Sequence, residues 1–389
     1  MITTESDLEA LVDKALSSDA VALDTEFVWD RTYYPSLGLI QVGYPDGTVD
    51  LIDATTIEDM SSLGRLLSDS RTTKILHDAV QDLVILTRVS NAFPRAIFDT
   101  QKAAGFVGLT SSISLSDLLN QVLSIRIEKS ETKSDWLARP LTDKQIEYAK
   151  EDVCYGVKLM HVMIDKAESL NRTDWINQEM EYYEDKSHYI ELDPLTVAPR
   201  VKRSGALNKK QKDVLRSIGA WRELMARKRN LPRKFILSDE NIVHLVKFPP
   251  KSYEALNKSS KLAQRFLAKN GKGLWESIER GHTEKLEPLG REESFTHKDE
   301  GMEARVDLSL AYIKGLSLNS EMDPALIGNR SNITNFVYDI MLGGERVHSN
   351  SLFQNWRKEF CGEDLHKLLS GEGSLRVDPD KKIPLFVED

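Results

Sequence analysis

Apolar residues recur with two different periods near the start of the chain. Between residues 5 and 17 they return every three or four positions, which predicts an amphipathic helix. Short apolar runs with alternating polar positions then predict three β-strands, at 20–27, 37–44 and 47–54. Pro45-Asp46-Gly47 lies between the last two strands, so these strands are expected to form a hairpin.

Apolar segments alternate with helical patterns from residue 75 to residue 168. Further strands are expected at 75–77 and 96–98, and helical periodicity covers 114–123 and 142–168. Strands that come first, followed by strands that alternate with helices, are typical of a mixed sheet. We therefore expect residues 1–170 to form one α/β domain with an antiparallel meander and added parallel strands.

The remaining sequence is predicted to be helical after a linker. An acidic stretch with two prolines indicates a linker at 171–206. Apolar residues at helical spacing then predict two all-α domains, at 207–290 and 296–372. A tail at 373–389 is rich in proline and charge, and we expect it to be loosely held.

Composition narrows the class of protein without changing this division. The chain has 389 residues, which suits two or three domains, and its net charge of −9 gives no general attraction to nucleic acid. Cys154 and Cys361 are too few for a disulfide framework or a zinc site. The acidic start does not match a signal peptide, and no apolar run is long enough to cross a bilayer. We expect a soluble, cytoplasmic protein without a membrane partner.

Two carboxylates occupy one face of the first predicted strand. Alternation places Ala22, Asp24 and Glu26 on the same side of VALDTEF. Carboxylates at i and i+2 repel each other unless a cation lies between them. A solvated strand face is the alternative, but a strand this apolar is expected to be central in the sheet. The pattern therefore favours a metal site.

Three further residues belong to the same candidate site. Tyr148 and Asp152 are four positions apart, so they share one helix face, and Asp82 lies near the start of a predicted helix. Each has a plain structural alternative, because surface helices carry such residues and acidic side chains suit helix N-termini. It is the set and its order that indicate a site.

This set resembles the DEDD exonuclease superfamily, and within it the ribonuclease D family, which has tyrosine in its last motif. Asp24 and Glu26 match the first motif, Asp82 matches the second, and Tyr148 with Asp152 matches the third.

The resemblance extends well beyond the motifs. IEKSETKSDWLARPLTDKQIEYAKEDV (127–153) looks like ribonuclease D at nearly every position, and ILHDAVQDL (75–83) and FDTQKAA (98–104) also fit. The likeness covers roughly residues 1–170 as the exonuclease domain. The helical remainder resembles the HRDC modules of the same family, closely at 215–250 and more weakly at 304–333.

The resemblance implies a fold related to ribonuclease H and a metal-dependent 3′→5′ exoribonuclease. Such an enzyme would trim RNA precursors such as tRNA and release nucleoside 5′-monophosphates. Two Mg²⁺ or Mn²⁺ ions are implied as cofactors. Asp24 would bridge both ions, Glu26 and Asp152 would complete one, and Asp82 would hold the other. Tyr148 would orient the attacking water, because a phenol with a pKa of about 10 is a poor base at neutral pH.

Two other functions are considered beside this one. An exonuclease that acts on DNA is the nearest, because some relatives use DNA. A non-catalytic RNA-binding scaffold belongs to a different class, and it predicts a missing carboxylate, whereas the sequence retains all four.

Six further residues of the first domain are expected to contact substrate. They are Phe27, Gln41, His77, Lys129, Trp136 and Arg139. The aromatic side chains could equally pack in the core, the glutamine could face a sheet edge, and a lone histidine is often held by hydrogen bonds. The basic side chains suit phosphate and sugar contacts.

A strongly basic segment opens the helical part of the chain. Residues 200–235 hold thirteen Lys and Arg against two acids, a local net charge of +11 in a chain of −9. Such a run is often only a solvated face, but this asymmetry favours contact with an RNA backbone. The residues expected to form the patch are Lys209, Lys210, Arg227, Lys228 and Arg229. No heptad seam is visible, so a monomer is expected.

Overall fold

The chain forms two compact units, which are described separately. The computed structural model describes residues 1–127, 131, 134–196, 201–259, 261–284, 286 and 300–388. One unit, here called the sheet unit, comprises Met1–Glu26, Leu37–Tyr189 and Phe295–Asp389. The other, the helical unit, comprises Phe27–Ser36 and Ile190–Ser294.

A five-stranded mixed sheet forms the centre of the sheet unit, with strand order β3-β2-β1-β4-β5. The strands are β1 (Ala20–Val28), β2 (Ser36–Gly43), β3 (Val49–Asp53), β4 (Thr73–Leu76) and β5 (Ile97–Asp99). β2 and β3 pair antiparallel, whereas β4 runs parallel to both β1 and β5. The predicted mixed α/β fold is confirmed.

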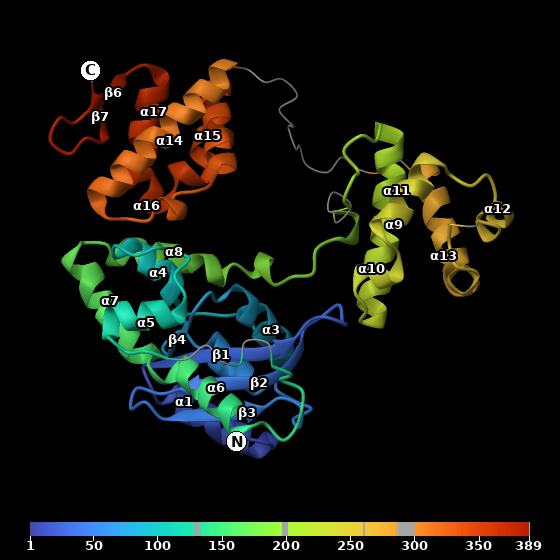
Figure 1. Cartoon of the computed structure of the whole chain (residues 1–389), viewed down its shortest axis with the longest axis horizontal. Coiled ribbons are helices and arrows are strands. Elements are labelled where there is room, and N and C mark those ends of the chain that lie inside the picture. Colours follow the sequence, from blue (N-terminus) through green and yellow to red (C-terminus); the bar gives the residue numbers. More distant parts are fainter. Residues whose placement is uncertain are drawn as a thin grey trace. The chain divides into compact units, whose positions relative to one another are not determined.

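Helices cover both faces of this sheet (Figure 1). They are α1 (Glu5–Leu16), α2 (Leu63–Ser68), α3 (Val80–Ser90), α4 (Thr100–Phe106), α5 (Leu115–Leu123), α6 (Asp143–Cys154) and α7 (Gly156–Ser169). The start of α7 packs on Ala22, on the same face of β1 as the two carboxylates. Thr25 points to the opposite face, where its hydroxyl reaches the first turn of α3.

The helical pattern at 142–168 is divided between two helices, α6 and α7. The break lies at Tyr155 and Gly156, where a Cβ added to the glycine would lie 2.5 Å from the Ala22 Cβ. Only a residue without a side chain allows the helix backbone to approach β1 so closely. On the two sides of this break, α6 contacts β3 and α7 contacts β4.

The expected linker at 171–206 begins with packed structure rather than with a free segment. α8 (Thr173–Met180) and the 3₁₀ turns η1 (Glu181–Glu184) and η2 (Lys186–His188) belong to the sheet unit. Ile176, Met180 and Tyr183 are buried there. Their helical spacing is present in the sequence, but the acidic residues around them hide it.

The C-terminal helices pack on α4 and α8 within the sheet unit. They are α14 (Glu300–Ser320), η5 (Pro324–Leu326), α15 (Arg330–Leu342), η6 (Gly344–Ser349), η7 (Ser351–Phe353), α16 (Asn355–Arg357), the π-turn η8 (Lys358–Gly362) and α17 (Glu363–Ser370). Arg357 forms a 2.9 Å ion pair with Glu179 of α8.

The expectation of a loosely held tail is not met by the structure. β6 (Gly373–Val377) and β7 (Pro384–Glu388) form an antiparallel hairpin, and β7 packs on α14. Leu375 and Phe386 contact the core of the sheet unit. Apolar residues lie on each side of a charged turn in this hairpin, Leu375 and Val377 in β6 and Leu385, Phe386 and Val387 in β7. The high charge of the segment therefore reflects its turn and its exposed face.

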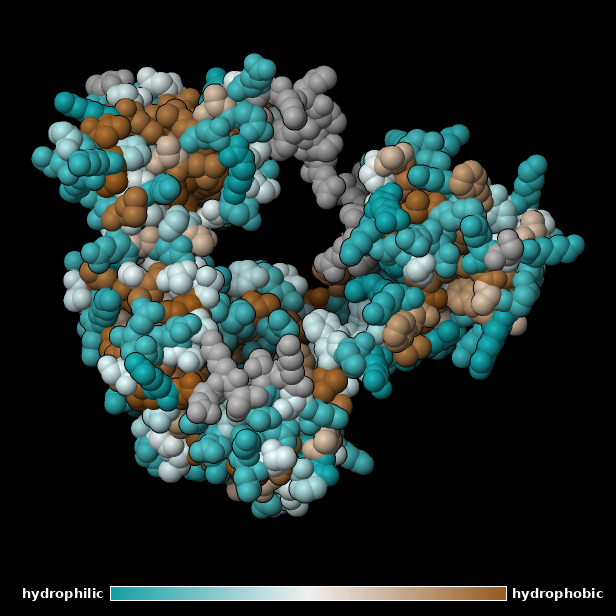
Figure 2. All heavy atoms as spheres, viewed as in Figure 1, coloured by the Kyte–Doolittle hydropathy of each residue, from teal (hydrophilic) through white to brown (hydrophobic). Residues whose placement is uncertain are grey.

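The helical unit has its own core. Its elements are η3 (Pro194–Thr196), α9 (Lys209–Arg229), α10 (Arg233–Ile236), α11 (Asp239–Lys247), α12 (Tyr253–Asn257) and α13 (Gln264–Thr283). Ile218 of α9, Leu245 of α11 and Leu274 of α13 are among its buried residues. Hydrophilic side chains cover much of the face of this unit seen in Figure 2.

Candidate active site

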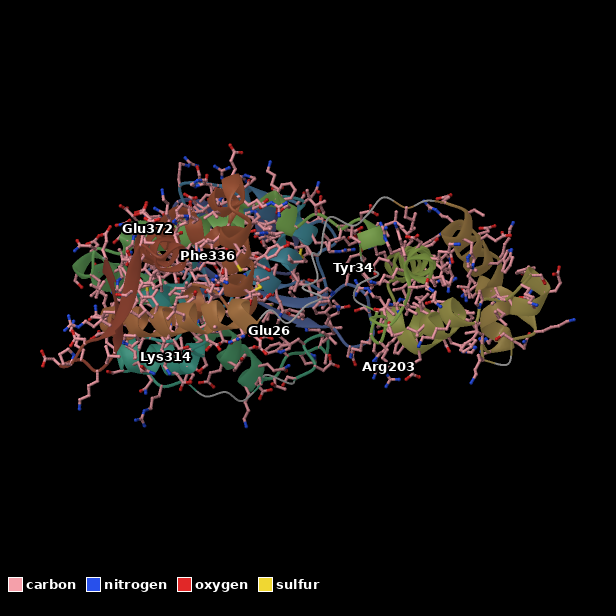
Figure 3. The ribbon with its side chains drawn as sticks, turned by 90° about the horizontal axis from the view of Figure 1, so that it is seen from above. Glu26, Tyr34, Arg203, Lys314, Phe336 and Glu372 are labelled. Carbon is pink, nitrogen blue, oxygen red and sulfur yellow. The ribbon has the colours of Figure 1, made fainter. Side chains whose placement is uncertain are left out.

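Asp24 and Glu26 lie on one face of β1, where the strand passes from buried to partly exposed residues. The residues from Ala20 to Leu23 are buried, whereas both carboxylates are half-buried. Glu26 lies on the blue ribbon of β1 (Figure 3). The alternation expected from the sequence therefore places the two acids together at the edge of the core.

Asp152 brings a third carboxylate to this face from α6. A capping box formed by Thr142 and Gln145 starts that helix, and it fixes which residues face the sheet. Carboxylate oxygens of Asp24, Glu26 and Asp152 all lie within 4.8 Å of one another. Three oxygen ligands at this separation fit a hard divalent cation.

The electrostatics of the cluster also fit a bound cation. Burial, followed by the charges of Asp82, Asp152 and Glu26, raises the pKa of Asp24 well above its usual range. Burial and the neighbouring carboxylates raise the pKa of Glu26 to about 8. Burial also raises the pKa of Asp152 to about 7. Carboxylates that resist ionisation in each other's presence become stable as anions when a cation lies between them.

Asp82 approaches the cluster from the first turn of α3. Its side chain is buried and accepts a hydrogen bond from the Thr25 hydroxyl, while burial raises its pKa to about 6. Asp82 lies outside the group of three close carboxylates, but its charge acts on both Asp24 and Glu26. Its charge therefore adds to the negative potential of the cluster.

Thr25 is a contributor that the sequence pattern did not reveal. Strand alternation assigns it to the core, and it is indeed 5% exposed. Its hydroxyl nevertheless connects the strand that carries Asp24 and Glu26 to the helix that carries Asp82. A threonine between two acidic residues in an otherwise apolar strand is the available signal, but it is a weak one.

Tyr148 lies one helical turn before Asp152 and packs against Trp136, with ring centroids 6.0 Å apart. Burial, then the charges of Asp152, Glu26 and Asp24, raises the pKa of Tyr148 further above its usual value. The hydroxyl therefore keeps its proton at neutral pH and donates a hydrogen bond to the Asp152 carboxylate. This chemistry suits the orientation of a water molecule and does not suit a general base.

A cavity of about 190 Å³ opens beside these residues, and Asp24, His77, Tyr148 and Asp152 line part of it. The imidazole of His77 is held at both nitrogens. Nε2 lies 3.0 Å from the Ile113 carbonyl oxygen, and Nδ1 lies 2.9 Å from the Thr100 hydroxyl. His77 thus lines the cavity with its ring held in place, and its contact with the substrate stays a prediction.

Arg139 is a structural residue and cannot donate to a phosphate as the sequence suggested. Its five N–H donors are all used inside the protein. They are directed to both carboxylate oxygens of Asp53 and to the carbonyls of Gly38, Trp136 and Ala138. The guanidinium thereby joins residues 136–139 to β2 and β3.

Trp136 also belongs to the core, since only 2% of it is exposed. It packs with Leu39, Leu51 and Leu141. Its ring also contacts the ring of Tyr148. Of the two roles expected for Trp136, RNA contact and core packing, the structure shows packing, which includes contact with the Tyr148 ring. An aromatic residue of a sequence motif can thus position a residue of the site without contacting the substrate itself.

The other predicted substrate contacts have different outcomes. Gln41 is fully buried on β2, so it faces neither the solvent nor a free sheet edge. Phe27 is half-buried, directly after Glu26 on β1. Lys129 lies outside the described residues. Contact of Phe27 with a terminal base stays a prediction.

The basic segment is less available to RNA than its charge suggests. Arg227 donates to Glu191 and to the Leu192 carbonyl and pairs with Glu223, with 13% of its side chain exposed. Arg229 donates to Asn270. Arg227 therefore has an internal role, and its assignment to the RNA-binding patch is not supported.

The exposed members of the predicted patch are lysines. Lys209 and Lys210 lie at the start of α9, and Lys228 lies near its end. These three side chains are exposed, and their contact with RNA stays a prediction.

Known proteins resemble this chain over both of its units. A profile of the family described as 3′-5′ exonuclease matches residues 1–168, and a profile described as HRDC domain matches residues 211–278. The ribonuclease D of Desulfotalea psychrophila is 37% identical over 367 residues, which is 92% of this chain and 96% of the relative. The ribonuclease D of Gluconacetobacter diazotrophicus is 30% identical over 99% of this chain and 96% of its own length.

A solved structure is also similar to this chain in fold. The crystal structure of Escherichia coli RNase D, an exoribonuclease involved in structured RNA processing, superimposes with a TM-score of 0.81 at 28% sequence identity. The match covers 95% of this chain and 98% of the other.

The fold and the carboxylate cluster together define a 3′→5′ exonuclease domain followed by an HRDC module. The chain belongs to the ribonuclease D family and is an exoribonuclease. Divalent cations are the cofactors of this class of nuclease, and the acidic cluster fits them. Among the described residues, no helix combines the length and apolarity needed to span a membrane.

Proposed function

We propose that this exoribonuclease removes nucleotides from the 3′ ends of RNA precursors, such as those of tRNA, by two-metal hydrolysis. The observation that carries the proposal is the meeting of Asp24, Glu26 and Asp152, whose oxygens lie within 4.8 Å and whose pKa values are all raised. Such a cluster is unfavourable without cations and suits them well. Nucleoside 5′-monophosphates would be the products.

Each residue of the cluster has a distinct part in this proposal. Asp24 would contact both Mg²⁺ or Mn²⁺ ions, Glu26 and Asp152 would complete one of them, and Asp82 would hold the other. When bound, the ions supply a nucleophile at neutral pH and neutralise charge on the scissile phosphate. The protonated Tyr148 hydroxyl orients the attacking water, while Trp136 and Asp152 hold the phenol in place.

RNA is the proposed partner of the helical unit too. Lys209, Lys210 and Lys228 are exposed on α9, and lysines give affinity for a phosphate backbone without selecting a sequence. A structured RNA substrate is supported by the likeness to the E. coli enzyme. We also propose a second HRDC-like module at 296–372 and a monomeric, cytoplasmic enzyme, which sedimentation and localisation experiments can test.

The proposal is tested with RNA and DNA oligonucleotides of the same sequence and with a free 3′ end. We expect stepwise shortening of RNA in Mg²⁺ or Mn²⁺, no reaction in EDTA, and loss of cleavage in Asp24→Ala. Asp165→Ala, which removes an exposed carboxylate of α7, is the matched control and should cleave normally. Persistent cleavage by Asp24→Ala would contradict the metal site. Equal rates of cleavage of DNA and RNA would contradict the proposal that RNA is the substrate.

A further inference from the structure

The buried carboxylate of Asp99 accepts hydrogen bonds from several segments that meet near the start of α3. Asp99 ends β5 and is fully buried. One of its oxygens accepts hydrogen bonds from the Gln101 N–H at 2.8 Å and the Lys102 N–H at 3.2 Å, so it caps its own helix, α4. This local role is an ordinary helix N-cap.

The same carboxylate also serves a second helix, α3. The Asp78 N–H donates to it at 3.2 Å and the Ala79 N–H at 3.0 Å. α3 has no cap of its own, because Ala79 occupies the N-cap position and has no polar side chain. Asp99 therefore supplies from β5 the acceptor that the sequence of α3 lacks.

The backbone at the start of α3 requires this support. Asp78 has φ of 61°, in the left-handed region that residues with a side chain seldom adopt. A backbone held in this conformation persists when surrounding interactions fix it. The hydrogen bonds that the Asp78 and Ala79 N–H groups donate to Asp99 hold the turn immediately before α3, and Asp82 follows Ala79 by three residues.

Tyr183 connects this carboxylate to a third element. Its hydroxyl donates to Asp99 from η1, and the tyrosine is 2% exposed. Asp99 thus accepts five hydrogen bonds in the described structure, from β4–α3, α4 and η1. A buried carboxylate with so many donors is costly to disturb, and its geometry is correspondingly well fixed.

We propose that Asp99 is a positioning residue for the metal site, and that it acts by fixing where α3 presents Asp82. Asp82 stands in the first turn of α3, and Thr25 holds it from β1. Movement of the turn at Asp78 would displace Asp82 relative to Asp24 and Glu26. This role of Asp99 rests on the proposed two-metal function, because that function requires Asp82 to bind one of the ions.

The test compares Asp99→Asn with wild type in the full-length chain. The amide keeps the shape of the side chain but removes its charge and one acceptor. We expect the half-saturating Mn²⁺ concentration for cleavage of a short RNA to rise roughly 10- to 100-fold, with the rate recovering at high Mn²⁺. Direct Mn²⁺ binding, followed by electron paramagnetic resonance without substrate, should weaken in parallel.

Asp323→Asn is the matched control for a loss of stability alone. Asp323 is also a helix-capping carboxylate, and it accepts from the Ala325 and Ser111 N–H groups. We expect it to lower the melting temperature without changing the Mn²⁺ dependence. An Asp99→Asn protein that folds and shows the wild-type Mn²⁺ dependence would overturn the proposal.

Two further variants test the same role of Asp99. If Asp99→Asn does not fold, Tyr183→Phe removes one of the five bonds and should shift the Mn²⁺ dependence in the same direction. An unchanged dependence in that variant also overturns the proposal. In an Asp82→Ala background, Asp99→Asn should cause no further loss of Mn²⁺ binding. If wild type itself binds no Mn²⁺, the proposed function has failed rather than the role of Asp99.

Discussion

Tyr148 is the residue whose protonation state the structure defines most directly. Burial and three nearby carboxylates keep its hydroxyl protonated at neutral pH. We predict that Tyr148→Phe lowers kcat by about 100-fold, as expected for the loss of a group that positions a proton or water. The half-saturating Mg²⁺ concentration should stay near the wild-type value, because the ring still packs on Trp136. Steady-state cleavage of a short RNA measures both quantities.

Tyr155→Phe is the control for that experiment. Tyr155 lies at the junction of α6 and α7, one residue before Gly156, and its hydroxyl has no part in the proposed site. It should cleave RNA at the wild-type rate. A large change in Mg²⁺ dependence for Tyr148→Phe would instead show that the phenol supports the metal site.

The carboxylate cluster predicts how stability changes with pH. In the folded protein, Glu26 and Asp152 have pKa values of about 8 and about 7, whereas unfolded carboxyl groups titrate near pH 4. Between these limits the folded state binds more protons than the unfolded state, so the cluster's contribution to stability is lost as pH rises. Without metal, the melting temperature should therefore fall from pH 5 to pH 8.

Divalent metal should reverse this loss. We expect Mg²⁺ or Mn²⁺ to raise the melting temperature more at pH 8 than at pH 5, because the cation replaces protons that hold the cluster at low pH. Asp24→Ala should show a smaller pH dependence and a smaller metal effect. Differential scanning calorimetry in EDTA and in metal gives the comparison. An equal metal effect at both pH values would contradict the explanation.

The site could be predicted from sequence where local geometry was sufficient. Strand alternation placed Asp24 beside Glu26, and helical spacing placed Tyr148 beside Asp152. Periodicity does not reveal the tertiary contacts of a residue, so strand alternation places Thr25 in the core without indicating its hydrogen bond to Asp82. For the same reason Arg139 and Trp136 were expected to touch RNA, whereas one pairs with Asp53 and the other supports Tyr148.

At the level of elements, the strands and helices of the first 170 residues could be predicted because their periodicity is strong. The predicted helical stretch 142–168 is interrupted at Gly156, because α7 packs directly on β1. That contact is tertiary and has no local signal beyond the glycine itself. Likewise, β6 and β7 were hidden by their charged turn, and α8 by the acidic residues around its apolar face.

The loop from Phe27 to Ser36 belongs to the helical unit through a specific set of contacts. The N–H groups of Tyr33 and Tyr34 donate to the Asn230 side chain at 3.1 and 3.0 Å. The Tyr33 hydroxyl reaches the buried Glu223, and Arg233 lies over its ring. The C-cap residue of α9 therefore fastens a loop that follows the catalytic strand β1 in the sequence.

We predict that Asn230→Gly releases this loop without unfolding α9. Asn230 has φ of 49°, which glycine adopts without strain, so the helix end should persist while both amides lose their acceptor. Hydrogen exchange at the Tyr33 and Tyr34 amides should quicken. Asn171→Gly, at φ of 55°, repeats the change elsewhere and should leave these amides protected. Unchanged exchange in Asn230→Gly would mean that Asn230 does not hold the loop.

For binding of RNA by the whole molecule, the distribution of charge along the chain matters more than the net charge. The chain carries −9, but the segment 200–235 carries +11. The fold neutralises part of this excess with acids from outside the segment, since Arg203 pairs with Glu240, Arg222 with Asp239 and Arg227 with Glu191. The positive charge that remains exposed on this segment is carried largely by lysines. The positive surface is therefore smaller than the sequence suggests.

We predict that changing Lys209, Lys210 and Lys228 to alanine weakens binding of long RNA and flattens its dependence on salt. If each lysine meets one phosphate of a single strand, the slope of log K against log salt should decrease in magnitude by about 2. Cleavage of a short oligonucleotide should persist at the wild-type rate, because the carboxylate cluster is untouched. Fluorescence anisotropy over a series of salt concentrations measures the slope.

The control removes three exposed lysines from the sheet unit instead, in the variant Lys314→Ala, Lys381→Ala and Lys382→Ala. Both variants lose the same charge, so a general electrostatic effect would flatten the two slopes equally and would contradict a specific role for α9. A larger loss in the α9 variant places the RNA backbone along that helix. Equal loss of cleavage on long and short RNA would also contradict the proposal, because the lysines would then be acting on the catalytic step rather than on substrate capture.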